Sequence, residues 1–289
     1  MDSDGQWDDS NNASRVDNQR PEAEGYWALH RIVNFFTRDK GVNGFHLFNR
    51  NGWNDAGGEW RMVVHYRKYA NKDYTVSMWS RNSTYGSRVY HGDGDGTIVT
   101  YKAALDASSH EWTHGVQFAE IPAPSPGGTP GFDGNLPAPF AIKEATADTI
   151  GCIIDAGWHM REEFEASIYF TGSLRNIKNA LVNGNSDHMD SAADGAGNGW
   201  RDNVVNGYEN STILSHAFYM MAMGSLHPVG IPGYEEISVF GEGVDFVENI
   251  IYRYLTQYAT SQVPCKIFVI KLFSPVLISI PVIPVKNGV

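Results

Sequence analysis

His110-Glu111-Trp112-Thr113-His114 is the stretch of this 289-residue chain that says most about its fold and chemistry. Residues four apart share one face of an α-helix, so a helix here places the two imidazoles one turn apart. Neutral imidazole is a common Zn²⁺ ligand, and two rings at this spacing reach one ion without bending the backbone. Glu111 follows the first ring directly and is better placed as a general base that takes a proton from water. The alternative is a helix with two unrelated histidines.

A catalytic zinc ion needs a third protein ligand. Residues 140–151 have apolar side chains at roughly helical spacing, with Glu144 and Asp148 one turn apart on one face. Two acids on a mostly apolar helix need partners, because an unpaired buried charge is costly. Glu144 as a ligand and Asp148 as the acceptor for a ligand histidine N–H would satisfy both. We therefore predict a zinc site of His110, His114 and Glu144.

These motifs resemble those of the thermolysin family of zinc neutral endopeptidases. The family has a His-Glu-x-x-His helix and then an Asn/Lys-Glu-Ala-x-x-Asp helix, which match residues 110–114 and 143–148. Further stretches follow in the family's order: 63–66, 88–96, 174–175, 186–188, 210–213 and 252–258. The resemblance covers residues 5–262. It implies an α+β, two-lobed fold with an N-terminal β-rich lobe, a C-terminal mainly helical lobe and the zinc helix between them.

The resemblance also implies an activity, that of a zinc-dependent metalloendopeptidase that hydrolyses internal peptide bonds of proteins or peptides. Glu111 would be its general base. Two alternatives stay open. The chain is a catalytically weak or inactive metal-binding relative that binds peptides or partners, or it is an aminopeptidase or peptide transferase that uses a similar zinc site.

Substrate-binding roles follow from the same resemblance. Arg175 would bind the substrate carbonyl just after the scissile bond, and Asn71 would bind substrate backbone. Leu174 and Ala107 would line the apolar pocket for the next side chain. From the sequence alone, Arg175 would be interpreted as an exposed helix cation.

A calcium site is implied by acids at matching positions. Its ligands would be Asp106, Asp155, Glu163 and Glu165. Clustered carboxylates suit a hard cation, which offsets their mutual repulsion. The family's last calcium carboxylate falls at Ile168, which cannot bind a metal, so we expect one calcium ion. The alternative is that these acids are solvated surface residues.

Three departures from the family pattern concern catalysis and the loop before Glu144. Tyr208 stands where the family has its transition-state histidine, and only Asp202 is available to orient it. A phenol can donate a hydrogen bond to an oxyanion, worth about 2.7–4 kcal/mol elsewhere, but it cannot act as an imidazolium. Asn135 replaces a tyrosine donor. The Pro/Gly-rich stretch 122–131 lengthens the connection to Glu144 and cannot be helical.

Strands and turns dominate the first part of the chain, and helices dominate the second. We predict a β-rich lobe over 1–105, with a helix near 24–37 and short strands over 44–101, then a helical catalytic lobe over 106–262. Besides the two site helices, the helices expected in the second lobe are 164–181, 212–223 and 244–258. Residues 263–289 form an atypical apolar tail.

Charge and composition indicate which kinds of partner, disulfide and location to expect. The net charge of −11 argues against nucleic acid, whose phosphates would be repelled. Cys152 and Cys265 make no disulfide framework. Lysine and prolines interrupt the apolar tail, so we expect no membrane span. Residues 1–4 lack the features of a signal peptide, whereas the family resemblance implies an extracellular location, and we expect a monomer.

Overall fold

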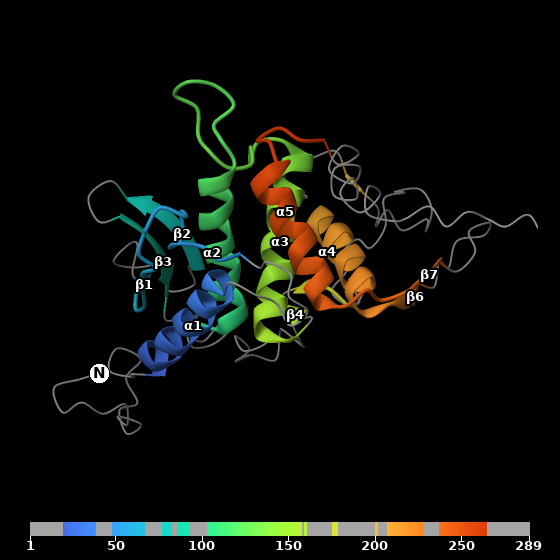
Figure 1. Ribbon diagram of the computed structural model, residues 1–289, viewed down its shortest axis with the longest axis horizontal. Helices are drawn as coiled ribbons and strands as arrows, with labels where there is room; N and C mark the ends of the chain where they lie inside the picture. Colours follow the sequence, from blue (N-terminus) through green and yellow to red (C-terminus); the bar gives the residue numbers. More distant parts are fainter. Residues whose placement is uncertain are drawn as a thin grey trace, which may run out of the picture.

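The structure, a computed structural model, describes residues 20–38, 48–66, 77–82, 86–92, 103–157, 159–160, 175–178, 200–201, 207–227 and 237–264. Helix α1 (Arg20–Thr37) and a small sheet lie on one side of helix α2 (Leu105–Glu120) (Figure 1). On its other side lie three more helices: α3 (Pro137–Asp155), α4 (Gly207–Met223) and α5 (Val244–Gln257). The helix that carries the histidine motif thus lies between a part that contains the sheet and a helical part.

The sheet has the strand order β1 (Met62–Val63), β3 (Gly86–His91), β2 (Ser77–Asn82). β1 runs parallel to β3, and β2 runs antiparallel to it in a register from Ser77 opposite His91 to Asn82 opposite Gly86. Within the described chain, β2 is an edge strand, and it packs against α2. Two short antiparallel pairs complete the strands: β4 (His159–Met160) with β5 (Arg175–Asn176), and β6 (Ser225–His227) with β7 (Ile237–Val239).

Helix α2 is buried on nearly all sides. Every residue from Leu105 to Thr113 is buried, although several are polar. A helix enclosed in this way must satisfy its polar side chains within the protein. Ser109 and Thr113 do so by donating to backbone carbonyls one turn earlier, at 2.6 and 2.8 Å. Trp112 is fully buried and meets the Trp60 ring at a centroid distance of 4.9 Å.

The Pro/Gly stretch projects between α2 and α3 as the long green loop in Figure 1. It is free of helix, as predicted, because proline lacks the N–H that a helix interior needs. The Gly131 N–H donates to the Ile121 carbonyl at 2.9 Å, which closes the base of the loop. Helix α3 then begins at Pro137, a residue suited to the first helical turn.

Most predicted helices are present with shifted ends, and one prediction is wrong. The helix expected over 24–37 begins at Arg20, and the one expected over 212–223 begins at Gly207. The helix expected over 164–181 is contradicted at Arg175–Asn176, which form β5. Pairing with β4, a tertiary contact that local periodicity does not encode, fixes this strand.

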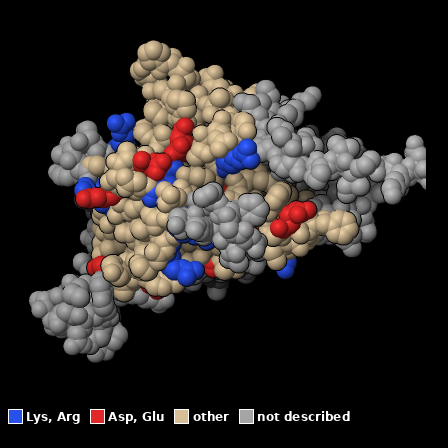
Figure 2. Space-filling view, in the orientation of Figure 1, with Lys and Arg blue, Asp and Glu red and all other residues tan. Residues whose placement is uncertain are grey.

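Two features concern binding partners: the distribution of charge on the surface, and whether any described helix could span a membrane. On the face shown in Figure 2, Lys and Arg are interspersed with Asp and Glu among the described residues. None of the described helices is both long and apolar enough to cross a membrane. Most of the apolar tail, 263–289, lies outside the described residues.

Candidate metal centre and active site

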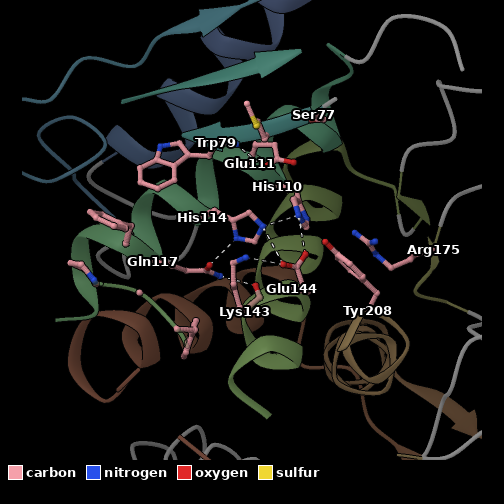
Figure 3. Close-up of a pocket in the computed structure, with 15 residues that line it drawn as sticks. Ser77, Trp79, His110, Glu111, His114, Gln117, Lys143, Glu144, Arg175 and Tyr208 are labelled. Atoms are coloured by element: carbon pink, nitrogen blue, oxygen red, sulfur yellow. Dashed lines mark hydrogen bonds and ion pairs between the residues drawn. The ribbon is translucent and has the colours of Figure 1, made fainter. Parts of the chain in front are cut away.

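Helices α2 and α3 bring the three predicted zinc ligands together. The Nε2 atoms of His110 and His114 are 3.0 Å apart. A carboxylate oxygen of Glu144 lies 3.3 Å from the Nε2 atom of His110, and its other oxygen lies 3.6 Å from that of His114. Figure 3 shows the two rings and the carboxylate facing one another across the gap between the helices.

This donor set fits Zn²⁺ in chemistry and in spacing. Ligand atoms that bind Zn²⁺ tetrahedrally, at about 2.0–2.1 Å from the ion, are about 3.3 Å from one another. The distances between the His110, His114 and Glu144 donor atoms, 3.0, 3.3 and 3.6 Å, bracket that value. Within the described part of the chain, His110, His114 and Glu144 are the one group of three or more such residues close enough to share an ion. Two imidazoles and one carboxylate are also a ligand set of catalytic zinc sites.

Two buried, oppositely charged side chains support the ligand His110. His110 Nδ1 lies 2.8 Å from Asp148, at the position that the sequence prediction requires. Asp148 in turn accepts two hydrogen bonds of 2.6 Å from Nε and Nη2 of Arg175. Asp148 is 0% exposed and Arg175 is 6% exposed, so each buried charge has an opposite partner.

The pKa values in the site follow from burial and from these charges. Burial opposes the charged form of His110, but hydrogen bonds to Asp148 and Glu144 raise its pKa to about 9. Burial and the Lys143 ammonium lower the pKa of His114. Burial opposes ionisation of Glu144, yet His114 and His110 hold its pKa well below normal. Burial also opposes ionisation of Asp148, and Arg175 together with His110 holds its pKa below normal. Both carboxylates therefore stay ionised.

The ligands open into a cavity of about 690 Å³. Its lining includes Trp79 of β2, Phe118 of α2 and Phe132, which follows the long loop, and the Trp79 and Phe118 rings are 5.1 Å apart. Arg175 and Tyr208 lie across the metal ligands from Trp79 (Figure 3). The cavity is large enough for amino-acid side chains and has both aromatic and charged walls.

Glu111 lines the same cavity, held by strand β2. The Trp79 backbone N–H donates to the Glu111 carboxylate at 2.9 Å. This contact needs β2 to lie very close to α2, and Gly115 permits it. A Cβ atom on Gly115 would lie 2.7 Å from the Trp79 ring nitrogen, closer than real Cβ contacts.

Tyr208, at the start of α4, borders the ligands. It is 52% exposed, its ring packs edge-on against Phe140 at 5.0 Å, and the Arg175 guanidinium lies 5.5 Å from the ring centre. Partial burial, reinforced by the Glu144 charge, raises the pKa of the Tyr208 phenol. The phenol is therefore protonated near neutral pH and can donate a hydrogen bond.

Two other residues named from the sequence are absent from the cavity lining: Asn135, which replaces the family's tyrosine donor, and Ala107, which was predicted to line a pocket. Asn135 bonds to Asp133 on the exposed loop, at 2.9 Å from its backbone N–H and 3.1 Å from its side chain, and does not line the cavity. Ala107 on α2 is fully buried, packs against Ala104 just before the helix and is likewise absent from the cavity lining. The pocket-lining role of Ala107 stays a prediction.

The calcium prediction is covered only in part by the described residues. Asp106 is fully buried in the first turn of α2, where its carboxylate accepts the Ala107 N–H. Asp155 is partly buried at the end of α3, and burial raises its pKa although Arg31 opposes this. The remaining predicted site residues lie outside the described residues: Glu163, Glu165, Asn71, Leu174 and Asp202.

Sequence reasoning missed two neighbours of the ligands. Gln117 lies 2.9 Å from His114 Nδ1, and the Lys143 ammonium lies 3.1 Å from the Glu144 carboxylate. Gln117 follows His114 by three residues, a spacing that places both on one helix face, so this signal was available.

Comparison with known families gives two matches that together cover most of the chain. The family model described as thermolysin metallopeptidase, catalytic domain, matches residues 1–117. The one described as thermolysin metallopeptidase, alpha-helical domain, matches residues 138–268. These matches confirm the resemblance noted from the motifs, and with it the α+β, two-lobed fold.

Individual relatives are more distant. Bacillolysin of Bacillus cereus is 27% identical over 224 residues, which is 74% of this chain and 33% of the relative. Neutral protease B of Bacillus subtilis is 26% identical over 216 residues, 74% of this chain and 34% of the relative. Thermolysin of Alicyclobacillus acidocaldarius is 27% identical over 209 residues, 69% of this chain and 32% of the relative. The chain spans about a third of the length of these relatives.

Proposed function

Because this chain belongs to the thermolysin family of metallopeptidases, we propose that it is a zinc-dependent endopeptidase that hydrolyses internal peptide bonds of proteins. The observation that carries the proposal is the meeting of the His110, His114 and Glu144 donor atoms beside Glu111, within one cavity. A metal-ligand set with an adjacent carboxylate base in an open pocket suits hydrolysis of an amide.

Glu111 performs the proton transfers in this proposal. Held by the Trp79 N–H, its carboxylate accepts a proton from the attacking water and later passes it to the leaving amine. Zn²⁺ bound by His110, His114 and Glu144 would polarise the scissile carbonyl and make water more acidic.

Two further side chains bind the reacting group. The Tyr208 phenol donates a hydrogen bond to the oxygen on which negative charge develops. Arg175 lines the cavity and uses Nε and Nη2 to hold Asp148. A guanidinium carries five N–H donors, so others remain for the substrate carbonyl.

On the basis of the family resemblance, we also propose a calcium ion, an extracellular location and a monomeric state. One calcium ion would bind Asp106 and Asp155 together with Glu163 and Glu165, and the enzyme would be a secreted monomer. Thermal unfolding with and without added Ca²⁺ tests the ion, since a ligand that binds the folded state raises the unfolding temperature. An unchanged unfolding temperature at saturating Ca²⁺ contradicts it.

Cleavage of casein by the purified chain, with and without a chelator, tests the activity. We expect cleavage that the chelator stops and added Zn²⁺ restores. Mass spectrometry of early products separates endopeptidase from exopeptidase action, because only the former yields fragments cut inside the chain. Products trimmed only at their ends would contradict an endopeptidase.

A second candidate is a metal-binding relative that binds peptides without cleaving them. Asn135 favours it, since this residue bonds to Asp133 on an exposed loop and does not line the cavity. Stoichiometric zinc with no casein cleavage would identify this alternative.

A further inference from the structure

Gln117 is almost fully buried at 1% exposure, on the same face of α2 as His114. Its side-chain oxygen lies 2.9 Å from the Nδ1 atom of His114. Its side-chain nitrogen lies 2.8 Å from the Lys143 carbonyl oxygen and 2.7 Å from the Thr146 hydroxyl. One amide therefore bridges a predicted metal ligand on α2 and two residues of α3, as Figure 3 shows for His114, Gln117 and Lys143.

The orientation of this amide follows from its partners. A backbone carbonyl only accepts hydrogen bonds, so the Gln117 group that faces Lys143 must be the NH₂ group. The Thr146 hydroxyl donates to the Ile142 carbonyl at 2.8 Å and is free to accept the second amide hydrogen. The Gln117 oxygen must then face His114.

This orientation fixes the tautomer of His114. An amide oxygen can only accept, so Nδ1 of His114 must carry the hydrogen. The lone pair of the neutral ring is then on Nε2, the atom that faces His110 and Glu144. Metal-binding histidines are commonly held in this way by an acceptor on the other ring nitrogen.

We propose that Gln117 is a positioning residue that holds His114 in its metal-binding tautomer and orientation, an inference that rests on the zinc site proposed above. His110 is held instead by Asp148, whose charge Arg175 offsets. The supports of the two rings thus add no net charge around the ion. Gln117 also ties α2 to α3 beside Glu144, so it holds together the two helices that supply the ligands.

Zinc affinity tests the proposal through a matched pair of variants. Gln117→Leu removes the acceptor for His114, whereas Thr146→Val removes only one of the two acceptors for the Gln117 NH₂ group and leaves Lys143 in place. We expect the zinc dissociation constant, measured by competition with a chelator, to rise about 10- to 100-fold in Gln117→Leu. In Thr146→Val it should change little. Equal affinities of Gln117→Leu and the wild type would overturn the proposal, as would equal losses in both variants.

A measurement on the unmodified chain does not depend on whether a variant folds. In the zinc-loaded wild type labelled with ¹⁵N-histidine, NMR should show a protonated Nδ1 and a metal-bound Nε2 for His114. Metal bound at Nδ1 would overturn the proposal. Neither readout uses hydrolysis, so a chain that binds zinc in this way but cleaves no peptide contradicts the proposed function and supports the role of Gln117.

Discussion

The backbone N–H of Trp79 donates a hydrogen bond of 2.9 Å to the carboxylate of Glu111. The two residues are 32 positions apart and lie on an edge strand and on the central helix. The donor belongs to the main chain, so the contact depends on how closely β2 approaches α2. The base is therefore positioned by packing between the sheet and the helix.

Gly115→Ala should weaken catalysis without removing the metal. The added methyl would collide with the Trp79 ring, push β2 away from α2 and release the Glu111 carboxylate. We expect kcat/KM to fall roughly 100-fold, the cost of a misplacement of about 1 Å, with zinc content unchanged. Gly134→Ala is the control, since a Cβ there would meet Phe140 at an ordinary 3.7 Å. Equal activity of both variants contradicts the role of Gly115.

Tyr208→Phe should lower kcat while KM stays nearly constant. The phenylalanine keeps the packing on Phe140 and loses only the hydroxyl that would stabilise the developing oxyanion. Loss of one such donor costs about 10²- to 10³-fold in kcat. Steady-state kinetics on an internally quenched peptide measures the effect, with Tyr26→Phe as the control because Tyr26 is 71% exposed on α1. An unchanged kcat would assign Tyr208 no part in catalysis.

Arg175→Leu should destabilise the fold. It removes the guanidinium that pairs with the buried Asp148 carboxylate and leaves His110 as the remaining partner. Loss of one member of a buried ion pair typically costs about 3–5 kcal/mol in the free energy of unfolding. Asp148→Asn combined with Arg175→Leu should recover part of this loss, because the stranded charge is gone. Urea unfolding compares the two. If the double variant is no more stable than Arg175→Leu, the buried charge is not the cause.

Glu248 on α5 should make stability depend on pH. Burial raises its pKa to about 7 although Arg38 lies 2.6 Å away and favours the charge. The unfolded chain releases this proton near 4.5, so between these pH values the folded chain holds more protons and stability falls as pH rises. Over this pH range the free energy of unfolding falls by an amount on the order of 3 kcal/mol.

Glu248→Gln isolates this contribution, because its neutral amide cannot ionise. The difference in unfolding free energy between variant and wild type should grow in the variant's favour from pH 4.5 to pH 7. Parallel stability profiles would show that Glu248 keeps an ordinary pKa.

Much of the site was predictable because its members are encoded locally. His110, His114 and Glu144 sit at helical spacings within two segments, and the helices that carry them pack together. Asp148 is one turn from Glu144. An acid on an apolar helix needs polar partners, and those of Asp148 are His110 and Arg175.

The remainder depends on tertiary contacts that no local pattern contains. Arg175 lies on a strand fixed by pairing with β4, where periodicity had indicated a helix. The Trp79 donor is a backbone group, so its residue type carries no signal for the contact with Glu111. Gln117 shares a face with His114, but only its bonds to Lys143 and Thr146 determine which way its amide points.

Glu111→Gln tests the central claim most directly, with bound zinc and peptide hydrolysis measured on the same preparations. The substitution keeps the size of the side chain and an acceptor for the Trp79 N–H but cannot take up a proton at neutral pH. We predict one zinc ion per chain in both proteins, and cleavage of an internally quenched peptide by the wild type alone. Full turnover by the variant, or loss of its zinc, would contradict the assignment of Glu111 as the base beside a site of His110, His114 and Glu144.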